Sequence, residues 1–191
     1  MVPAGYMAKR VVTRPDWLGA ASVSSIYSVS GCIAENFADY INFWKHNGYW
    51  FFDSPEIIID IGRESEIDLA GTVLFFYEVH DLQFDSGEWK HFEPEGSFGT
   101  NVSAPEEKVL EGYDVVTFYV QASPECSPLS CNGLAAEVQT NTRCLLQSFE
   151  QARTLLEDGT FNDSEPGPYR IFAVYSVAWP GGLIGTNGPK Q

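Results

Sequence analysis

The sequence predicts one α+β (or mixed α/β) domain, in which a central sheet of about four or five strands carries helices packed on it. Two observations lead to this fold class. The chain has 191 residues, of which 44% are hydrophobic, and this suffices to bury a core in a single domain. Short apolar runs typical of strands also alternate along the chain with helical stripes. We expect the domain to span residues 14–179, between a flexible N-terminal segment, 1–13, and a disordered Gly/Pro tail, 180–191.

The first third of the chain predicts a strand and two helices. Residues 22–29 form the first strand. Apolar side chains then recur at helical spacing over 33–46, and Asn47-Gly48 is a typical helix stop. A second helix is predicted over 55–65, with a capping serine and a proline at its first position, although the three isoleucines inside it favour a strand.

The rest of the chain supplies the central strands and two further helices. A near-continuous apolar run predicts a strand at 72–80, and an alternating run predicts another at 113–121. Between them lies a long acidic excursion, 81–112, with a hairpin expected at Asp85-Ser86-Gly87. A short helix at 132–138, a helix from the Ser148 capping box to Gly159, and a strand at 169–177 complete the domain. We find no repeat with a period of 20–50 residues and no glycine-rich phosphate loop.

The charge balance disfavours several classes of partner. With 26 acidic and 11 scattered basic residues, the net charge is −15, which argues against nucleic acid and anionic membranes. No apolar run could span a bilayer, and no apolar stretch of a signal peptide follows Lys9 and Arg10, so we expect a cytoplasmic protein. Residues 53–111 alone hold 15 acidic and 3 basic side chains. This part of the chain is either a solubilising face or a surface for a basic partner.

The four cysteines are expected to be reduced. Cys126, Cys131 and Cys144 form a C-x4-C-x12-C pattern at the loose edge of zinc-ligand spacing, and a histidine would have to complete the site from elsewhere in the chain. A Cys126–Cys131 disulfide and buried free thiols are the alternatives. The sequence favours free thiols, and it predicts neither a metal nor a cofactor.

A small Cys–His enzyme, either a hydrolase or a transferase, is the second functional class. Cys32 and Cys131 each lie near the start of a predicted helix, whose N-terminus would lower the pKa of a thiol. His80 or His91 would then act as the base. The same histidines, with the acids around them, offer a weaker case for a mixed histidine–carboxylate metal site.

A ligand-binding module with an aromatic pocket is the third class. The aromatic side chains are those of Trp44, Tyr49, Trp50, Phe51 and Phe52, which crowd around residues 45–48. Aromatic residues at this density can line a pocket, although core packing is their commoner use.

Three stretches of the chain are distinctive. They are WKHNGYW at 44–50, which runs into DSPE at 53–56, ECSPLSCNGLA at 125–135 and GPYRIFAVY at 167–175. Together they resemble a family of bacterial proteins with no assigned function, over most of the chain from about Arg14 to Trp179. In size, acidity and α+β pattern the chain is also loosely similar to proteins that confer immunity to bacterial toxins. The first resemblance implies no activity, and the second implies a protein-binding role.

Charge and the second resemblance together favour a non-enzymatic, immunity-type binding protein. It would neutralise a basic protein partner, such as a bacterial toxin, by electrostatic and steric block. The sequence carries no signal for a particular oligomeric state. The expected contact residues are six acids and one aromatic anchor: Glu56, Asp60, Glu64, Asp81, Asp85, Glu88 and Trp89.

Overall fold

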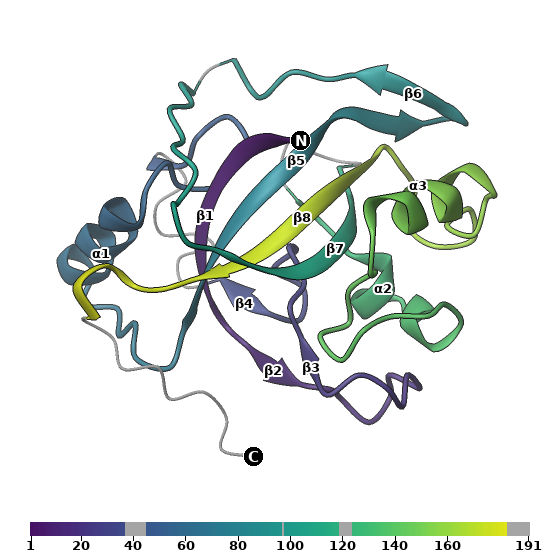
Figure 1. The fold of residues 1–191 in the computed structure, drawn as a ribbon, viewed down its shortest axis with the longest axis horizontal. Coiled ribbons are helices and arrows are strands. Elements are labelled where there is room, and N and C mark those ends of the chain that lie inside the picture. Colours follow the sequence, from purple (N-terminus) through teal and green to yellow (C-terminus); the bar gives the residue numbers. More distant parts are fainter. Residues whose placement is uncertain (37–44, 97, 119–123, 183–191) are drawn as a thin grey trace.

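An antiparallel sheet forms the centre of the protein, as seen in a computed structural model that describes residues 1–36, 45–96, 98–118 and 124–182 (Figure 1). In spatial order its strands are β4 (Glu35–Asn36), β1 (Val2–Arg10), β5 (Val73–Asp85), β8 (Tyr169–Val177) and β7 (Val109–Thr117). A further strand, β6 (Glu88–His91), pairs with the end of β5. The predicted α+β fold class is therefore confirmed.

Helices flank this sheet. α1 (Pro55–Glu64) lies beside β1, and α3 (Phe149–Glu157) lies beside β7 and β8, toward the opposite side of the molecule in Figure 1. The shorter elements are α2 (Pro128–Cys131), the 3-10 turns η2 (Leu134–Ala136) and η3 (Pro180–Gly182), and a two-stranded sheet of β2 (Val12–Thr13) and β3 (Ser25–Ile26). Among the described residues, no helix is long and apolar enough to cross a membrane.

The register of the sheet places two buried charges on one face. Lys9 of β1 lies opposite Val73 of β5. Asp114 of β7 lies opposite Phe172 of β8, which in turn lies opposite Val79 of β5. Residues that pair directly share a face, and alternate residues of one strand also share a face. Lys9 and Asp114 therefore point to the same side of the sheet.

The fold contains the same unit twice. β1, α1 and β5 form one strand–helix–strand unit whose two strands pair, and β7, α3 and β8 form another. Gly5 lies opposite Tyr77 in the first unit, and Gly112 lies opposite Val174 in the second. Tyr77 and Val174 lie opposite each other where β5 pairs with β8. These equivalent positions place a pseudo-twofold axis between Tyr77 and Val174.

An asparagine turn precedes the helix of the first unit. Asn47 Nδ2 donates to the carbonyl of Ala4 at 2.8 Å, and Asn47 Oδ1 accepts from the backbone N–H groups of Tyr49 and Phe51. The turn presses against β1 so closely that a Cβ atom on Gly5 would lie 2.7 Å from the Cβ of Phe51. Glycine is therefore required at this position of β1.

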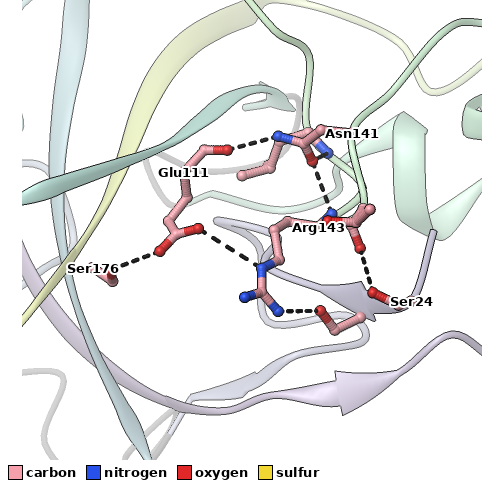
Figure 2. Close-up of polar contacts among 8 residues, drawn as sticks. Ser24, Glu111, Asn141, Arg143 and Ser176 are labelled. Carbon is pink, nitrogen blue, oxygen red and sulfur yellow. Dashed lines mark hydrogen bonds and ion pairs between the residues drawn. The ribbon is translucent and has the colours of Figure 1, made fainter. Parts of the chain in front are cut away.

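The second unit repeats this turn before α3. Asn141 Nδ2 donates to the carbonyl of Glu111 at 2.7 Å, and its Oδ1 accepts from the backbone N–H groups of Arg143 and Leu145 (Figure 2). A Cβ atom on Gly112 would lie 2.7 Å from the Cβ of Leu145. The same turn conformation therefore occurs in both halves of the chain.

Most elements predicted from residue 55 onward are confirmed. The helix predicted at 55–65 is α1, the expected hairpin at residues 85–87 joins β5 to β6, and the strand at 169–177 is β8. Ser148 caps α3, because its Oγ accepts from the backbone N–H of Gln151 at 3.1 Å. Of the short helix predicted at 132–138, only the 3-10 turn η2 is present, and α2 lies just before this region. β7 begins at Val109, and the last residues of the strand predicted at 113–121 lie outside the described part.

The N-terminal third was predicted less well. Residues 1–13 are not a flexible segment, because β1 pairs with the central strand β5 and buries its apolar side chains. The strand predicted at 22–29 is reduced to β3, since neighbouring amides bond to the carbonyls of Thr142 and Arg143. The helix predicted at 33–46 begins instead with a turn and β4, and residues 37–44 lie outside the described part. In the predicted tail, residues 180–182 form η3, and 183–191 lie outside the described part.

Candidate functional site

Three cysteine thiols gather over the sheet face that carries Lys9 and Asp114. The Sγ atoms of Cys32, Cys126 and Cys131 all lie within 4.8 Å of one another. Cys32 belongs to the excursion between β1 and the first asparagine turn, and the other two belong to the excursion between β7 and the second turn. Equivalent parts of the two units therefore supply the cluster. In the part of the chain that the structure describes, it is the one group of three metal-ligating side chains close enough to share an ion.

Lys9 holds the segment that carries Cys32. This lysine is completely buried, and its ammonium donates to the carbonyls of Val29 at 2.8 Å, Ser30 at 2.7 Å and Ala34 at 3.4 Å. A buried ammonium requires such acceptors, because it has lost its water. Residues 29–34 therefore fold around the ammonium group of Lys9, and Cys32 lies in the middle of this segment.

Asp114 joins this segment to the one that carries the other thiols. Its Oδ2 accepts from the backbone N–H of Val29 at 2.8 Å, and its Oδ1 accepts from the hydroxyl of Ser127 at 2.6 Å. The carbonyl of Ser127 in turn accepts from the backbone N–H of Cys131 at 2.8 Å. Burial raises the pKa of Asp114 to about 6, while these hydrogen bonds oppose the rise.

Each thiol also has an oxygen neighbour: Cys32 Sγ lies 2.9 Å from the carbonyl of Glu125, Cys126 Sγ 3.2 Å from Asn132 Oδ1, and Cys131 Sγ 3.7 Å from Ser30 Oγ. The carbonyl next to Cys32 favours its protonated form. Hydrogen bonds from Cys126 and Cys131 lower the pKa of Cys32 to about 3, although its partial burial opposes this shift. The pKa of Cys126 is raised, chiefly by its interaction with Cys131 and then by that with Cys32. The two neighbouring thiols therefore favour the thiolate form of Cys32.

The cluster differs from the zinc pattern considered in the sequence. Cys144 does not join Cys126 and Cys131, and Cys32 takes its place. Cys144 is buried in the core beside α3, where burial raises the pKa of its thiol to about 12. It occupies a position of the second asparagine turn, three residues after Asn141, with a φ of 64°. No cysteine is part of a disulfide in the structure.

Neither histidine of the proposed Cys–His enzyme contacts these thiols. His80 lies 3.1 Å from Asp81 and packs its ring against Trp89 and Phe149. His91 is exposed at the end of β6. The expected helix N-termini are also absent at the thiols, since Cys131 is the last residue of α2 and Cys32 lies in a turn. The arrangement therefore gives no support to Cys–His catalysis.

The predicted partner-binding residues fall into two separate groups. Glu56, Asp60 and Glu64 lie on α1, where Asp60 pairs with Arg63 and Glu64 with Lys45. The others lie on the β5–β6 hairpin, which projects on the other side of the molecule (Figure 1). There Asp85 pairs with Lys90 and the indole of Trp89 donates to Glu157, while Asp81 and Glu88 belong to the same hairpin. No single surface combines all seven.

The aromatic run at 44–52 is mostly core. Phe51 and Phe52 are buried against the sheet, and Trp50 stacks on the buried His46 with ring centroids 4.1 Å apart. Tyr49 is half-buried beside Phe92, and Trp44 lies outside the described residues.

Lys9, Asp114, Ser30 and Ser127 were not identified from the sequence. A lone lysine and a lone aspartate in strands carry no local pattern, so their roles emerge only when the sheet register places them together. Comparison of the chain with protein-family models, with curated proteins and with solved structures found no match.

Proposed function

We propose that the protein binds a thiophilic metal ion, with Zn²⁺ as the first candidate, through Cys32, Cys126 and Cys131. The observation that supports this function is the convergence of three thiols within 4.8 Å of one another. Tetrahedral zinc with Zn–S bonds of about 2.3 Å places its sulfur ligands about 3.8 Å apart. Soft thiolate ligands favour Zn²⁺ or Cu⁺ over Mg²⁺ or Ca²⁺.

The metal would connect the two halves of the fold. Cys32 comes from the first unit, and Cys126 and Cys131 come from the second. A metal–ligand bond to each would cross-link segments that are otherwise joined by hydrogen bonds and apolar packing. Because Cys32 is exposed, solvent reaches the site. Three thiols, one of them accessible, would leave a coordination position for a further ligand, as catalytic zinc sites do.

Cobalt substitution tests this function. Co²⁺ bound by thiolates has intense charge-transfer and visible absorption, so titration of the reduced protein should give saturating bands at one equivalent. Cys32→Ser, Cys126→Ser and Cys131→Ser should each weaken the bands and lower the affinity. Cys144→Ser is the matched control, since this thiol lies outside the cluster and should leave the spectrum unchanged. Absence of thiolate-to-cobalt bands in the wild-type protein would refute the proposal.

A second candidate is the immunity-type binding protein that the charge favours. The specific observation in its support is the projecting β5–β6 hairpin, which carries Asp81, Asp85, Glu88 and Trp89 together. A basic partner would associate rapidly and in a salt-sensitive way. Pull-down at low and high salt should recover a stoichiometric basic protein, which reversal of the three hairpin acids to lysine should release. The same reversal of Glu56, Asp60 and Glu64 is the control, and equal retention by all variants would contradict a hairpin interface.

A further inference from the structure

We infer that Asp114 is the positioning residue of the three-thiol site: its two carboxylate oxygens set the separation between the segment that carries Cys32 and the segment that carries Cys126 and Cys131. The inference rests on the proposed metal-binding function. Asp114 is completely buried on β7, which pairs with β8 along its length. The carboxylate therefore projects from a rigid part of the fold.

Each oxygen of the carboxylate serves a different segment. Oδ2 accepts from the backbone N–H of Val29 at 2.8 Å, three residues before Cys32. Oδ1 accepts from Ser127 Oγ at 2.6 Å, at the start of the helix that ends with Cys131. An ionised carboxylate only accepts hydrogen bonds, so both donors converge on it without competition.

Lys9 also holds the segment that carries Cys32. Its ammonium binds the carbonyl of Val29 at 2.8 Å, while Asp114 binds the N–H of the same residue. Both polar groups of one peptide residue are thus held by buried charges from two strands of the sheet, β1 and β7. The segment is fixed in position before any metal arrives. Mutation of residues that hold metal ligands in position typically lowers metal affinity by 10–100-fold.

The test compares Asp114→Asn and Ser127→Ala with Val115→Ala. Asp114→Asn keeps the size of the side chain but replaces one acceptor oxygen with an NH2 group. The neutral amide therefore cannot accept hydrogen bonds from both Val29 and Ser127. Ser127→Ala removes the hydrogen bond from Ser127 to Asp114 and retains the carboxylate. Val115→Ala is the matched control, because Val115 is the buried neighbour on the same strand, in the cluster beside α3, and its truncation lowers stability while leaving the hydrogen bonds to both segments in place.

Cobalt affinity and the thiolate-to-cobalt spectrum are measured for each variant alongside urea unfolding. Asp114→Asn should weaken Co²⁺ binding by about 10–100-fold and alter the band positions, Ser127→Ala should do so to a smaller extent, and Val115→Ala should change neither. If Asp114→Asn fails to fold, Ser127→Ala against Val115→Ala decides the question. Wild-type affinity and spectrum in the folded Asp114 or Ser127 variant would overturn the positioning role while leaving the metal site intact. Absence of binding to the wild-type protein would refute the metal site itself.

Discussion

The side chains of Asn47 and Asn141 make the same three hydrogen bonds in the two halves of the chain. Three residues after each asparagine, Trp50 and Cys144 adopt the same left-handed backbone, with φ of 67° and 64°. Each turn then leads through a serine into a helix that begins beside the sheet. The two strand–helix–strand units therefore share one local structure. The thiol site lies where the connection that follows β1 meets the connection that follows β7.

Loss of either asparagine side chain should destabilise the fold. Asn47→Ala removes an acceptor from two backbone N–H groups and a donor from the Ala4 carbonyl, all in a buried turn. The free energy of unfolding should fall by about 1–3 kcal/mol, because the backbone groups that bonded to Asn47 lose this partner and remain shielded from water. Asn141→Ala should act in the same direction. Urea unfolding measures the loss, with the exposed Asn101→Ala as control; an unchanged midpoint for Asn47→Ala would contradict the role of the turn.

Gly5 and Gly112 should resist substitution by alanine. Their φ angles are 140° and 147°, and a Cβ atom would meet the facing turn at 2.7 Å in each case. Backbone strain of this kind costs on the order of 1–3 kcal/mol, before any steric clash is counted. Gly99→Ala is the control, since nothing lies within 4 Å of its Cβ position. Equal urea midpoints for the three variants would show that the close approach does not constrain the fold.

The repeated unit explains why the sequence predicted the fold class but not its symmetry. Helical spacing and a serine cap are local signals, so α1 and α3 could be predicted from the chain. The repeat lies in a few positions, chiefly the Gly-Tyr pairs at 5–6 and 112–113 and the two asparagines, with excursions of unequal length between them. β1 was missed for a related reason, since small, aromatic and charged residues are mixed along it, and they gain their burial from pairing with β5 rather than from their own pattern.

Cys32 should react with iodoacetamide at a rate that is nearly independent of pH. Hydrogen bonds from Cys126 and Cys131 hold the pKa of this thiol at about 3, so it stays a thiolate throughout the accessible range. In chelator-treated protein, labelling followed by mass spectrometry from about pH 5 to about pH 8 should show a flat profile for Cys32. Cys144, whose pKa burial raises to about 12, should remain unlabelled. A tenfold rise per pH unit at Cys32 would contradict the thiolate assignment.

His80 should make the protein less stable in mild acid. Burial lowers the pKa of its imidazole below the ordinary 6.5, although the neighbouring Asp81 opposes this shift. The folded state therefore favours neutral His80, and the stability it contributes is present above pH 6.5 and is lost as the pH falls below that value. The urea midpoint of the wild type should fall more than that of His80→Gln between about pH 7.5 and about pH 5.5. His91→Gln, at an exposed position, should behave like the wild type, and parallel losses in all three proteins would contradict the prediction.

The candidate site could be predicted only in part, because its residues are far apart in the chain. The sequence placed Cys126 and Cys131 together, five positions apart, and suggested Cys144 as the third ligand. The spacing could not reveal that Cys144 lies in the asparagine turn, or that Cys32, from the other half of the chain, is the third thiol of the cluster. These facts depend on the sheet register that brings Lys9 and Asp114 to one face.

The most direct test of the central claim is X-ray absorption at the zinc edge on reduced protein loaded with one equivalent of Zn²⁺. The account predicts a first shell that contains three sulfur ligands at about 2.3 Å, and two sulfur ligands after Cys32→Ser. A shell made of oxygen and nitrogen alone, or zinc that washes off the wild-type protein, would contradict the three-thiolate site.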